Sequence, residues 1–467
     1  MILSISAGIS RGGGHDDVVH GDVCRPLWRR ASGKKGALLA QRLVETQSPI
    51  VRKLGNNRAC TVGFGRFLGN RAVMPDEVFA AAGAATGVRA AGRHVLAIQD
   101  TTHLSFPRRA GGTLGPGGDG TVPGLFLHPV LALDASDGTA LGLAAGRVWT
   151  RRPGKVTARR KRALADKESM RWIEAGAAAK AALAEARQVT LIADRESDIY
   201  EAWAALPDAR FALLTRASRD RKLAGGERLF AATADWPEAD RIVLDLPPRK
   251  GRPARRALLA LKYGTVRICR PRHCSTPGLA KTVTLQLVEV EELAAAPGEA
   301  AIHWRLLTTH AVTNTAKAHQ IIAWYRQRWR IEEYFRVLKR SGIDLEAAMV
   351  EGAHALLNLV AMAAVAGVAV MQLVEGRDAG PERRAGEVIA ADELDFALAL
   401  NRTLEGRTDK QKNPHQQGSL AWLSWIVARL GGWSGYRRYG PPGPKTIAYG
   451  WDQFKTMSQG WNLRKNV

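Results

Sequence analysis

The sequence predicts an α/β fold in which one mixed sheet carries helices on its faces. Short runs rich in Val, Leu and Ile, at 95–99 and 189–193, have the composition of strands that are buried on both faces. Segments with helical periodicity follow, at about 167–187 and 197–206. Strand-like and helix-like segments that alternate in this way are typical of a single sheet flanked by helices.

The expected elements run in the order strand, strand, strand, helix, strand, helix, and then continue the sheet. The other strands of this first part are expected at 125–133, 141–149 and 211–216. A β-rich insertion is expected at about 222–300, where a basic loop, Pro247–Arg256, lies among three more strand-like runs. These runs are 241–246, 257–263 and 283–290.

Composition divides the chain into four regions. The first is glycine-rich and charged without a clear period, so we expect it to be disordered or to be an added extension. The second should be helical, because Pro75 suits a first helical turn and the acids at 76 and 77 favour the helix N-terminus. The third holds the sheet, and the fourth is a helical C-terminal region. Their bounds are 1–34, 35–85, 86–375 and 376–467.

One helix is predicted over Tyr325–Lys339, with the sequence YRQRWRIEEYFRVLK. At about 100° per residue, four of its polar side chains lie within about 60° of one another, and Arg336 joins them. These four are Tyr325, Arg328, Glu332 and Lys339. An apolar stripe beside them gives the helix a face to bury. A carboxylate among cationic and phenolic groups suits a metal-binding acid surrounded by phosphate-binding side chains.

Two further carboxylates are candidates to join Glu332. Asp100 and Asp194 each end a run that is predicted to be a buried strand, so each would be held at the rim of the sheet. Three carboxylates could hold two divalent ions about 3.5–4 Å apart. The oxygen ligands favour Mg²⁺ or Mn²⁺. Asp134 is a rival for Asp100, and Asp198 is a rival for Asp194 that better suits a structural partner of Arg195 or of a helix N-terminus.

At these residues the chain resembles the DDE transposases of bacterial insertion sequences, in the branch that carries the Y-R-E-K signature. The motifs are QDTTHLSF, ADRESDIYEAW and Y-x2-R-x3-E-x6-K, together with a K-E-S-x-x-W element at Lys167–Trp172. The resemblance covers about 64–461. It implies a ribonuclease-H-like mixed sheet with a β-rich insertion, between a helical N-terminal DNA-binding region and a C-terminal dimerisation domain.

The resemblance also assigns roles to single residues. Asp100, Asp194 and Glu332 become the catalytic, metal-binding triad, with two Mg²⁺ or Mn²⁺ ions per active site. Trp304 would stack on a base near the cleaved strand. The other DNA-binding positions are Tyr325, Arg328, Arg336, Lys339 and Arg216. The implied activity is cleavage at the terminal inverted repeats of the element by a homodimer, followed by joining of the freed 3′-hydroxyl ends to target DNA.

The charge of the chain agrees with a nucleic-acid partner. Lys and Arg number 68 against 44 Asp and Glu, a net charge of +24 in 467 residues. Such an excess favours a polyanion, because binding it neutralises phosphates and releases counterions. An arginine-rich composition without any partner is the alternative that charge alone leaves open.

Other features bear on where the protein acts. The first residues lack the pattern of a secretory signal, so we expect a cytoplasmic protein. The apolar stretch Ala355–Val374 is long enough to span a bilayer, but its alanine content and its polar Asn358 favour a buried core helix over a membrane span. Cys269, His273 and Cys274 lie close together without a second ligand pair, which disfavours a zinc site.

Two functions from other classes stay open. One is a DNA-binding protein without catalysis, such as an inhibitor of transposition or an inactive relic. The other is a structure-selective nuclease on the same fold, which would cut branched DNA without strand transfer. The Trp-rich tail is equally ambiguous, since it suits either the dimer contact or an ordinary helical core.

Overall fold

The computed structural model describes most of the chain beyond its first 32 residues. The prediction for residues 1–34 therefore falls outside the described part, apart from Gly33 and Lys34, and so does most of the basic loop Pro247–Arg256. The described stretches are 33–106, 114–118, 122–151, 169–246, 253–274, 276–295, 301–339, 342–377, 383–389, 391–435 and 440–465.

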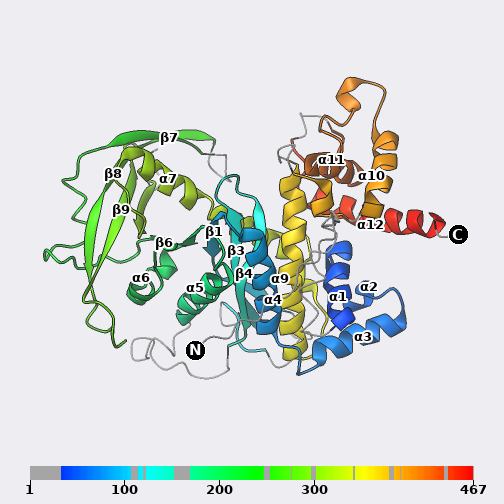
Figure 1. The fold of residues 1–467 in the computed structure, drawn as a ribbon, viewed down its shortest axis with the longest axis horizontal. Coiled ribbons are helices and arrows are strands. Elements are labelled where there is room, and N and C mark those ends of the chain that lie inside the picture. The colour runs from blue at the N-terminus through cyan, green and yellow to red at the C-terminus, as the bar shows by residue number, and fades with distance from the viewer. Residues whose placement is uncertain are drawn as a thin grey trace, which may run out of the picture.

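A ten-stranded sheet forms the centre of the described part (Figure 1). The strands follow the order β2-β3-β1-β5-β6-β10-β9-β8-β7, and β4 pairs with β3. The neighbours β1 (His94–Gln99), β5 (Gln188–Ala193) and β6 (Phe211–Arg216) are parallel, and the other pairs are antiparallel. The remaining strands are β2 (Thr102–Ser105), β3 (Gly124–Asp134), β4 (Ala140–Trp149), β7 (Asp240–Leu246), β8 (Arg255–Cys269), β9 (Thr282–Glu292) and β10 (His303–Thr308).

The predicted mixed α/β class is confirmed at this level. The strands expected within 222–300 are present as β7, β8 and β9, and they continue the central sheet instead of forming a separate one. Strand β10 connects the two parts of the sheet, because it pairs with β9 on one side and with β6 on the other. The sheet is therefore long and mostly antiparallel, with its parallel strands in the middle.

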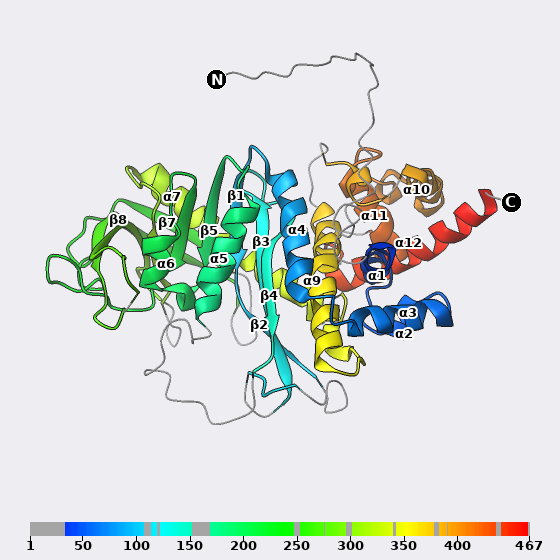
Figure 2. The same ribbon diagram turned by 60° about the horizontal axis from the view of Figure 1, so that its bottom comes forward.

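Helices cover both faces of the sheet (Figure 2). Side chains of β1 alternate between the two faces, as a buried strand requires. Val95 and Ala97 join the core that includes α5 and α6, whereas Leu96 and Ile98 join the core that includes α7, α8 and α9. The helices are α4 (Pro75–Ala90), α5 (Met170–Ala182), α6 (Tyr200–Ala205), α7 (Thr315–Arg326), α8 (Trp329–Lys339) and α9 (Ala353–Gly376).

The apolar helix α9 packs within the fold. Its length and hydropathy would allow it to cross a membrane, but 72% of its most apolar window is buried inside the structure, as expected of a core helix. Gly367 allows close approach to α8, since a Cβ there would lie 2.6 Å from Leu338 Cδ2. Tyr334 of α8 donates a hydrogen bond to the Ala364 carbonyl, at 2.6 Å. These contacts with α9 therefore fix the position of α8 relative to the sheet.

Asn358 explains the polar residue in the middle of this apolar helix. It is fully buried, and its Nδ2 donates to the carbonyls of Leu68 and Val73, each at 2.9 Å. These bonds hold the turn between the helices α3 (Arg58–Gly69) and α4 against α9.

Replacing Asn358 with leucine is expected to lower the free energy of unfolding by about 2–4 kcal/mol, because two buried carbonyls lose their donor. Urea denaturation measures this loss. Asn56→Leu, at an exposed asparagine, is the control and should leave the transition within about 0.5 kcal/mol of the wild type. Equal free energies of unfolding for the two variants would contradict this role of Asn358.

The helices at the two ends of the chain lie on the α9 side of the sheet (Figure 1). The C-terminal helices enclose their own apolar cluster, in which Trp422, Trp425 and Trp451 are buried. These tryptophans therefore serve a helical core, and whether the region also forms a dimer contact stays a prediction. The remaining helices are α1 (Gly33–Thr46), α2 (Val51–Leu54), α10 (Ala391–Leu404), α11 (Leu420–Leu430) and α12 (Pro444–Lys465), with short 3₁₀ turns at Leu345–Ala347, Ala385–Glu387 and Asp409–Gln411.

The prediction of one continuous helix over Tyr325–Lys339 is wrong. Helix α7 ends at Arg326 and α8 begins at Trp329. Between them the backbone makes bonds to the third residue back: Arg328 N donates to Tyr325 O at 3.0 Å, and Ile331 N donates to Arg328 O at 3.3 Å. Such bonds tighten the turn, so an angle of 100° per residue does not hold across it.

Candidate active site

Asp100 and Asp194 lie side by side at one end of the sheet. Strands β1 and β5 are parallel and in register, with Ile98 opposite Ile192, and each aspartate follows two residues later. Neighbouring strands are about 4.8 Å apart, so the two loops that carry the aspartates are adjacent. Asp100, Asp194 and Arg216 form a row along this end of the sheet, because Ala193 pairs with Thr215 in the next parallel strand.

Glu332 reaches the same place from α8, through Arg328. The Arg328 guanidinium pairs with Asp100 Oδ2 at 3.2 Å through one terminal nitrogen and with Glu332 Oε1 at 3.0 Å through the other. Arg328 is thus a cation held between two of the three predicted metal ligands. The structure brings the predicted triad into one neighbourhood, with a guanidinium inside it.

The fit of a divalent ion to this site is mixed. The donor set suits Mg²⁺ or Mn²⁺, which prefer carboxylate and water oxygens. Within the described residues, however, no three His, Cys, Asp or Glu side chains are grouped closely enough to hold one ion. The row formed by Asp100 and Asp194 offers two ligands, and Glu332 would join them once Arg328 withdrew.

Asp100 is the carboxyl group most strongly perturbed by its surroundings here. Burial raises its pKa to about 7, and the nearby charge of Asp194 and, to a lesser degree, that of Glu332 act in the same direction. The backbone N–H of Thr101 and the Arg328 guanidinium oppose this rise. A buried acid crowded by other acids is costly when it is ionised, and a bound cation would remove that cost.

The raised pKa of Asp100 predicts how stability depends on pH. Because the folded value, about 7, exceeds the ordinary 3.8, Asp100 destabilises the fold progressively as pH rises from about 4 to 7 and fully above that. Asp100→Asn should raise the free energy of unfolding at pH 8 by about 3–4 kcal/mol, at about 1.4 kcal/mol per pKa unit, because the net rise already includes the opposing charge of Arg328.

Denaturation at pH 4 and pH 8 without divalent ions tests this prediction. At pH 4 both the carboxylic acid and the amide are neutral, so the difference between the two proteins should nearly disappear. A variant that is no more stable than the wild type at pH 8 would show that Asp100 is not strained in the metal-free fold.

A polar network behind the aspartates holds their loops, and sequence reasoning missed it. Arg171 of α5 donates to the Thr101 hydroxyl at 2.8 Å and pairs with Glu196 at 2.9 Å, so it connects the loop after Asp100 with the loop after Asp194. The Thr101 hydroxyl also contacts His128 Nδ1 at 2.8 Å. Burial lowers the pKa of His128 well below its ordinary value, which keeps this partner uncharged.

The predicted DNA-contacting residues do not all lie on one surface. Tyr325 is buried, and its ring meets the half-buried Trp304 edge to face, at 5.7 Å between centroids. Arg336 is exposed on α8, whereas Lys339 is half-buried at the end of that helix. Arg328 pairs with Asp100, and Arg216 lies beside Asp194 because the residues before them pair in register.

The structure places both rival acids outside the site. Asp134 pairs with Val95 at the opposite end of β1 and forms an ion pair with Arg93 at 2.6 Å. Asp198 is buried and has a structural role, but its carboxylate pairs with Arg221, and its bond to Arg195 is only from its backbone N–H to the Arg195 carbonyl. The Asp194 side chain accepts a hydrogen bond from the Glu196 N–H at 2.8 Å, which caps the 3₁₀ turn Arg195–Ser197.

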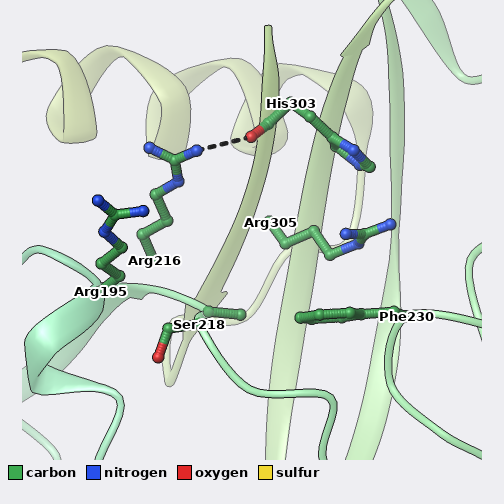
Figure 3. A pocket seen from close by; sticks show the side chains of 7 residues that line it. Arg195, Arg216, Ser218, Phe230, His303 and Arg305 are labelled. Carbon is green, nitrogen blue, oxygen red and sulfur yellow. Dashed lines mark hydrogen bonds between the residues drawn. The ribbon is translucent and has the colours of Figure 1, made fainter. Parts of the chain in front are cut away.

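A cavity of about 280 Å³ opens beside Arg216 (Figure 3). Arg195 and Arg216 line one side, and Arg305 lies over the Phe230 ring on the other, with 4.4 Å between the guanidinium carbon and the ring centroid. Sequence reasoning missed Arg195, Phe230 and Arg305, because long-range pairing of β10 with β6 and β9 brings them together.

Two comparisons with known proteins bear on the site. A solved structure described as the piggyBac transposase synaptic complex with hairpin DNA is similar over 79% of this chain, at 10% identity and a TM-score of 0.31. This chain spans 57% of the length of that chain. The family model of the transposase DDE domain matches residues 172–366, which include Asp194 and Glu332 but not Asp100. This match supports a DDE transposase.

Proposed function

We propose that this protein is a DNA transposase of the Y-R-E-K branch, which cleaves DNA at the terminal inverted repeats of its own insertion sequence. The observation that carries the proposal is the pairing of Arg328 with both Asp100 and Glu332, next to the Asp194 loop, within a chain whose residues 172–366 match the transposase DDE domain. The net charge of +24 supports DNA as the partner.

The chain's own residues would perform the positioning. The aspartates are held rigidly, because each follows a buried strand and Arg171 ties their loops together. Arg328 would exchange its carboxylate partners for a phosphate of the cleaved strand, which its planar guanidinium can bind through two nitrogens. Arg216 lies next in the row and would hold a neighbouring phosphate.

Asp100, Asp194 and Glu332 would hold two divalent ions, and the chemistry that such ions would supply is activation of the attacking hydroxyl and stabilisation of the leaving oxygen. The protein's contribution is then alignment of the strand and neutralisation of charge. We further propose that two copies of the chain pair the two ends of the element, and that the freed 3′-hydroxyls attack target DNA.

A cleavage assay tests this function. DNA that carries the repeats flanking this gene is incubated with the protein in Mg²⁺ or in EDTA, and the ends are mapped on both strands. We expect a nick that leaves a 3′-hydroxyl at the repeat boundary, only with the metal. Tight repeat binding without any cut would instead indicate a non-catalytic inhibitor or relic.

A further inference from the structure

We propose that the cavity beside Arg216 is a second phosphate subsite. It would take a phosphodiester of the same DNA strand, a few nucleotides from the one held at the carboxylates. The proposal rests on the proposed function, since it needs DNA to lie across the aspartates. It adds a recognition site built from Arg195, Arg305 and Phe230, none of which belongs to the predicted set.

The charge of the cavity favours an anion. Three of the residues that line it are arginines, at 195, 216 and 305, and its lining in the described part of the chain includes no carboxylate. No Asp or Glu among the described residues pairs with Arg195 or Arg216, and Arg216 donates only to the His303 carbonyl, at 2.9 Å. Two guanidinium groups therefore face the cavity without an anionic partner in the described part of the chain.

Arg305 is held in place before any ligand arrives. Its guanidinium lies over the Phe230 ring, and its Nε is 2.7 Å from Oε1 of the buried Glu289. A stacked and paired arginine loses little conformational freedom when it binds a phosphate. This preorganisation distinguishes the cavity from a mobile basic surface.

The opposite wall of the cavity is fixed as well. The buried Asp198 accepts hydrogen bonds from the backbone N–H groups of Ser218 and Arg219, at 2.7 and 2.9 Å. It also pairs with the buried Arg221. These bonds anchor the loop after β6. They therefore also limit the directions in which the Arg216 side chain can point.

The position of the cavity identifies the ligand as a neighbouring stretch of the bound strand. Successive residues of a strand point to opposite faces, so Arg305 and Trp304 lie on different faces of β10. Two strand spacings, about 10 Å, separate β5 from β10. One DNA strand carries a phosphate about every 3.4 Å of axis and its phosphates are farther apart along the strand itself, so the subsite lies at most about three nucleotides from the cleavage point.

Binding of precut repeat DNA in EDTA tests the subsite without catalysis. The variants are Arg195→Gln, which loses no side-chain partner among the described residues, and Arg305→Gln, whose amide nitrogen can take the place of the Arg305 Nε beside Glu289. Each should bind about 10- to 100-fold more weakly, and the slope of log affinity against log salt should fall by about 0.9. Arg219→Gln is the control, because Arg219 lies exposed on the same loop and does not line the cavity.

Neutral methylphosphonate groups, placed one at a time along the strand, locate the contact. In the wild type one position, about one to three nucleotides from the cleavage point, should weaken binding, and in the two variants that penalty should vanish. An equal effect of Arg219→Gln, or a penalty that survives in the variants, would overturn the subsite. Metal-dependent nicking with no such signal would reject the subsite alone, whereas a clear signal without nicking would reject only the catalytic proposal.

Discussion

Asp194→Asn is expected to reduce metal-dependent nicking by about 10³-fold or more, while DNA binding in EDTA stays within about twofold of the wild type. The asparagine keeps the oxygen that accepts from the Glu196 N–H, so the turn that follows β5 should be retained. It loses the negative charge that would hold a divalent ion. A loss of about 4 kcal/mol of transition-state stabilisation corresponds to this factor.

Asp137→Asn is the matched control for this experiment. Asp137 is exposed near the opposite end of the sheet, and its side chain accepts from the N–H two residues ahead at 2.8 Å, as the Asp194 side chain does. The same chemical change there should leave nicking unaltered. Wild-type nicking by Asp194→Asn would remove this residue from the active site.

Arg328→Ala is expected to have two opposite effects. Without the guanidinium, Asp100 and Glu332 lose their cation, so the variant should bind Mn²⁺ about tenfold more tightly in the absence of DNA. The same variant should nick DNA about 10- to 100-fold more slowly, because a charge-assisted contact to the cleaved strand is lost.

Calorimetric titration with Mn²⁺ and the nicking assay separate these effects. Arg326→Ala is the control, since Arg326 is exposed at the end of α7 and outside the ion pairs of the site. It should leave metal binding unchanged. Weaker Mn²⁺ binding by Arg328→Ala would show that Arg328 supports the ligands instead of competing with the metal.

The sequence could locate Asp100 and Asp194 because the signal is local. Each ends a run of apolar residues, and parallel strands in register bring such ends together. The class of fold followed from the same runs. The rival Asp134 shares this local signal, and only the pairing with β1 shows that it lies at the other end of the sheet.

Features that depend on packing were beyond the sequence pattern. The break between α7 and α8 is a change from bonds four residues back to bonds three residues back, and no proline or glycine between Tyr325 and Lys339 marks it. Arg171 and Arg305 look like ordinary surface arginines in the sequence. Their roles follow from partners far away in the chain, Thr101 and Glu289 respectively.

The C-terminal tryptophans show a different limit of prediction from sequence. Composition identifies a Trp-rich region, but a tryptophan buried within one chain and a tryptophan buried between two chains have the same sequence signal. The structure buries Trp422, Trp425 and Trp451 within the chain. A dimer contact would therefore use other surface of this region.

The most direct test of the proposed function is a strand-transfer assay. Precut DNA that ends in the flanking repeats is incubated with the protein, Mg²⁺ and a supercoiled plasmid, and the junctions are sequenced. We expect the 3′-hydroxyl ends of the repeats to be joined covalently to the plasmid, and Asp194→Asn to form no such junctions. Nicked plasmid without joined ends would contradict the transposase and would indicate a nuclease on this fold.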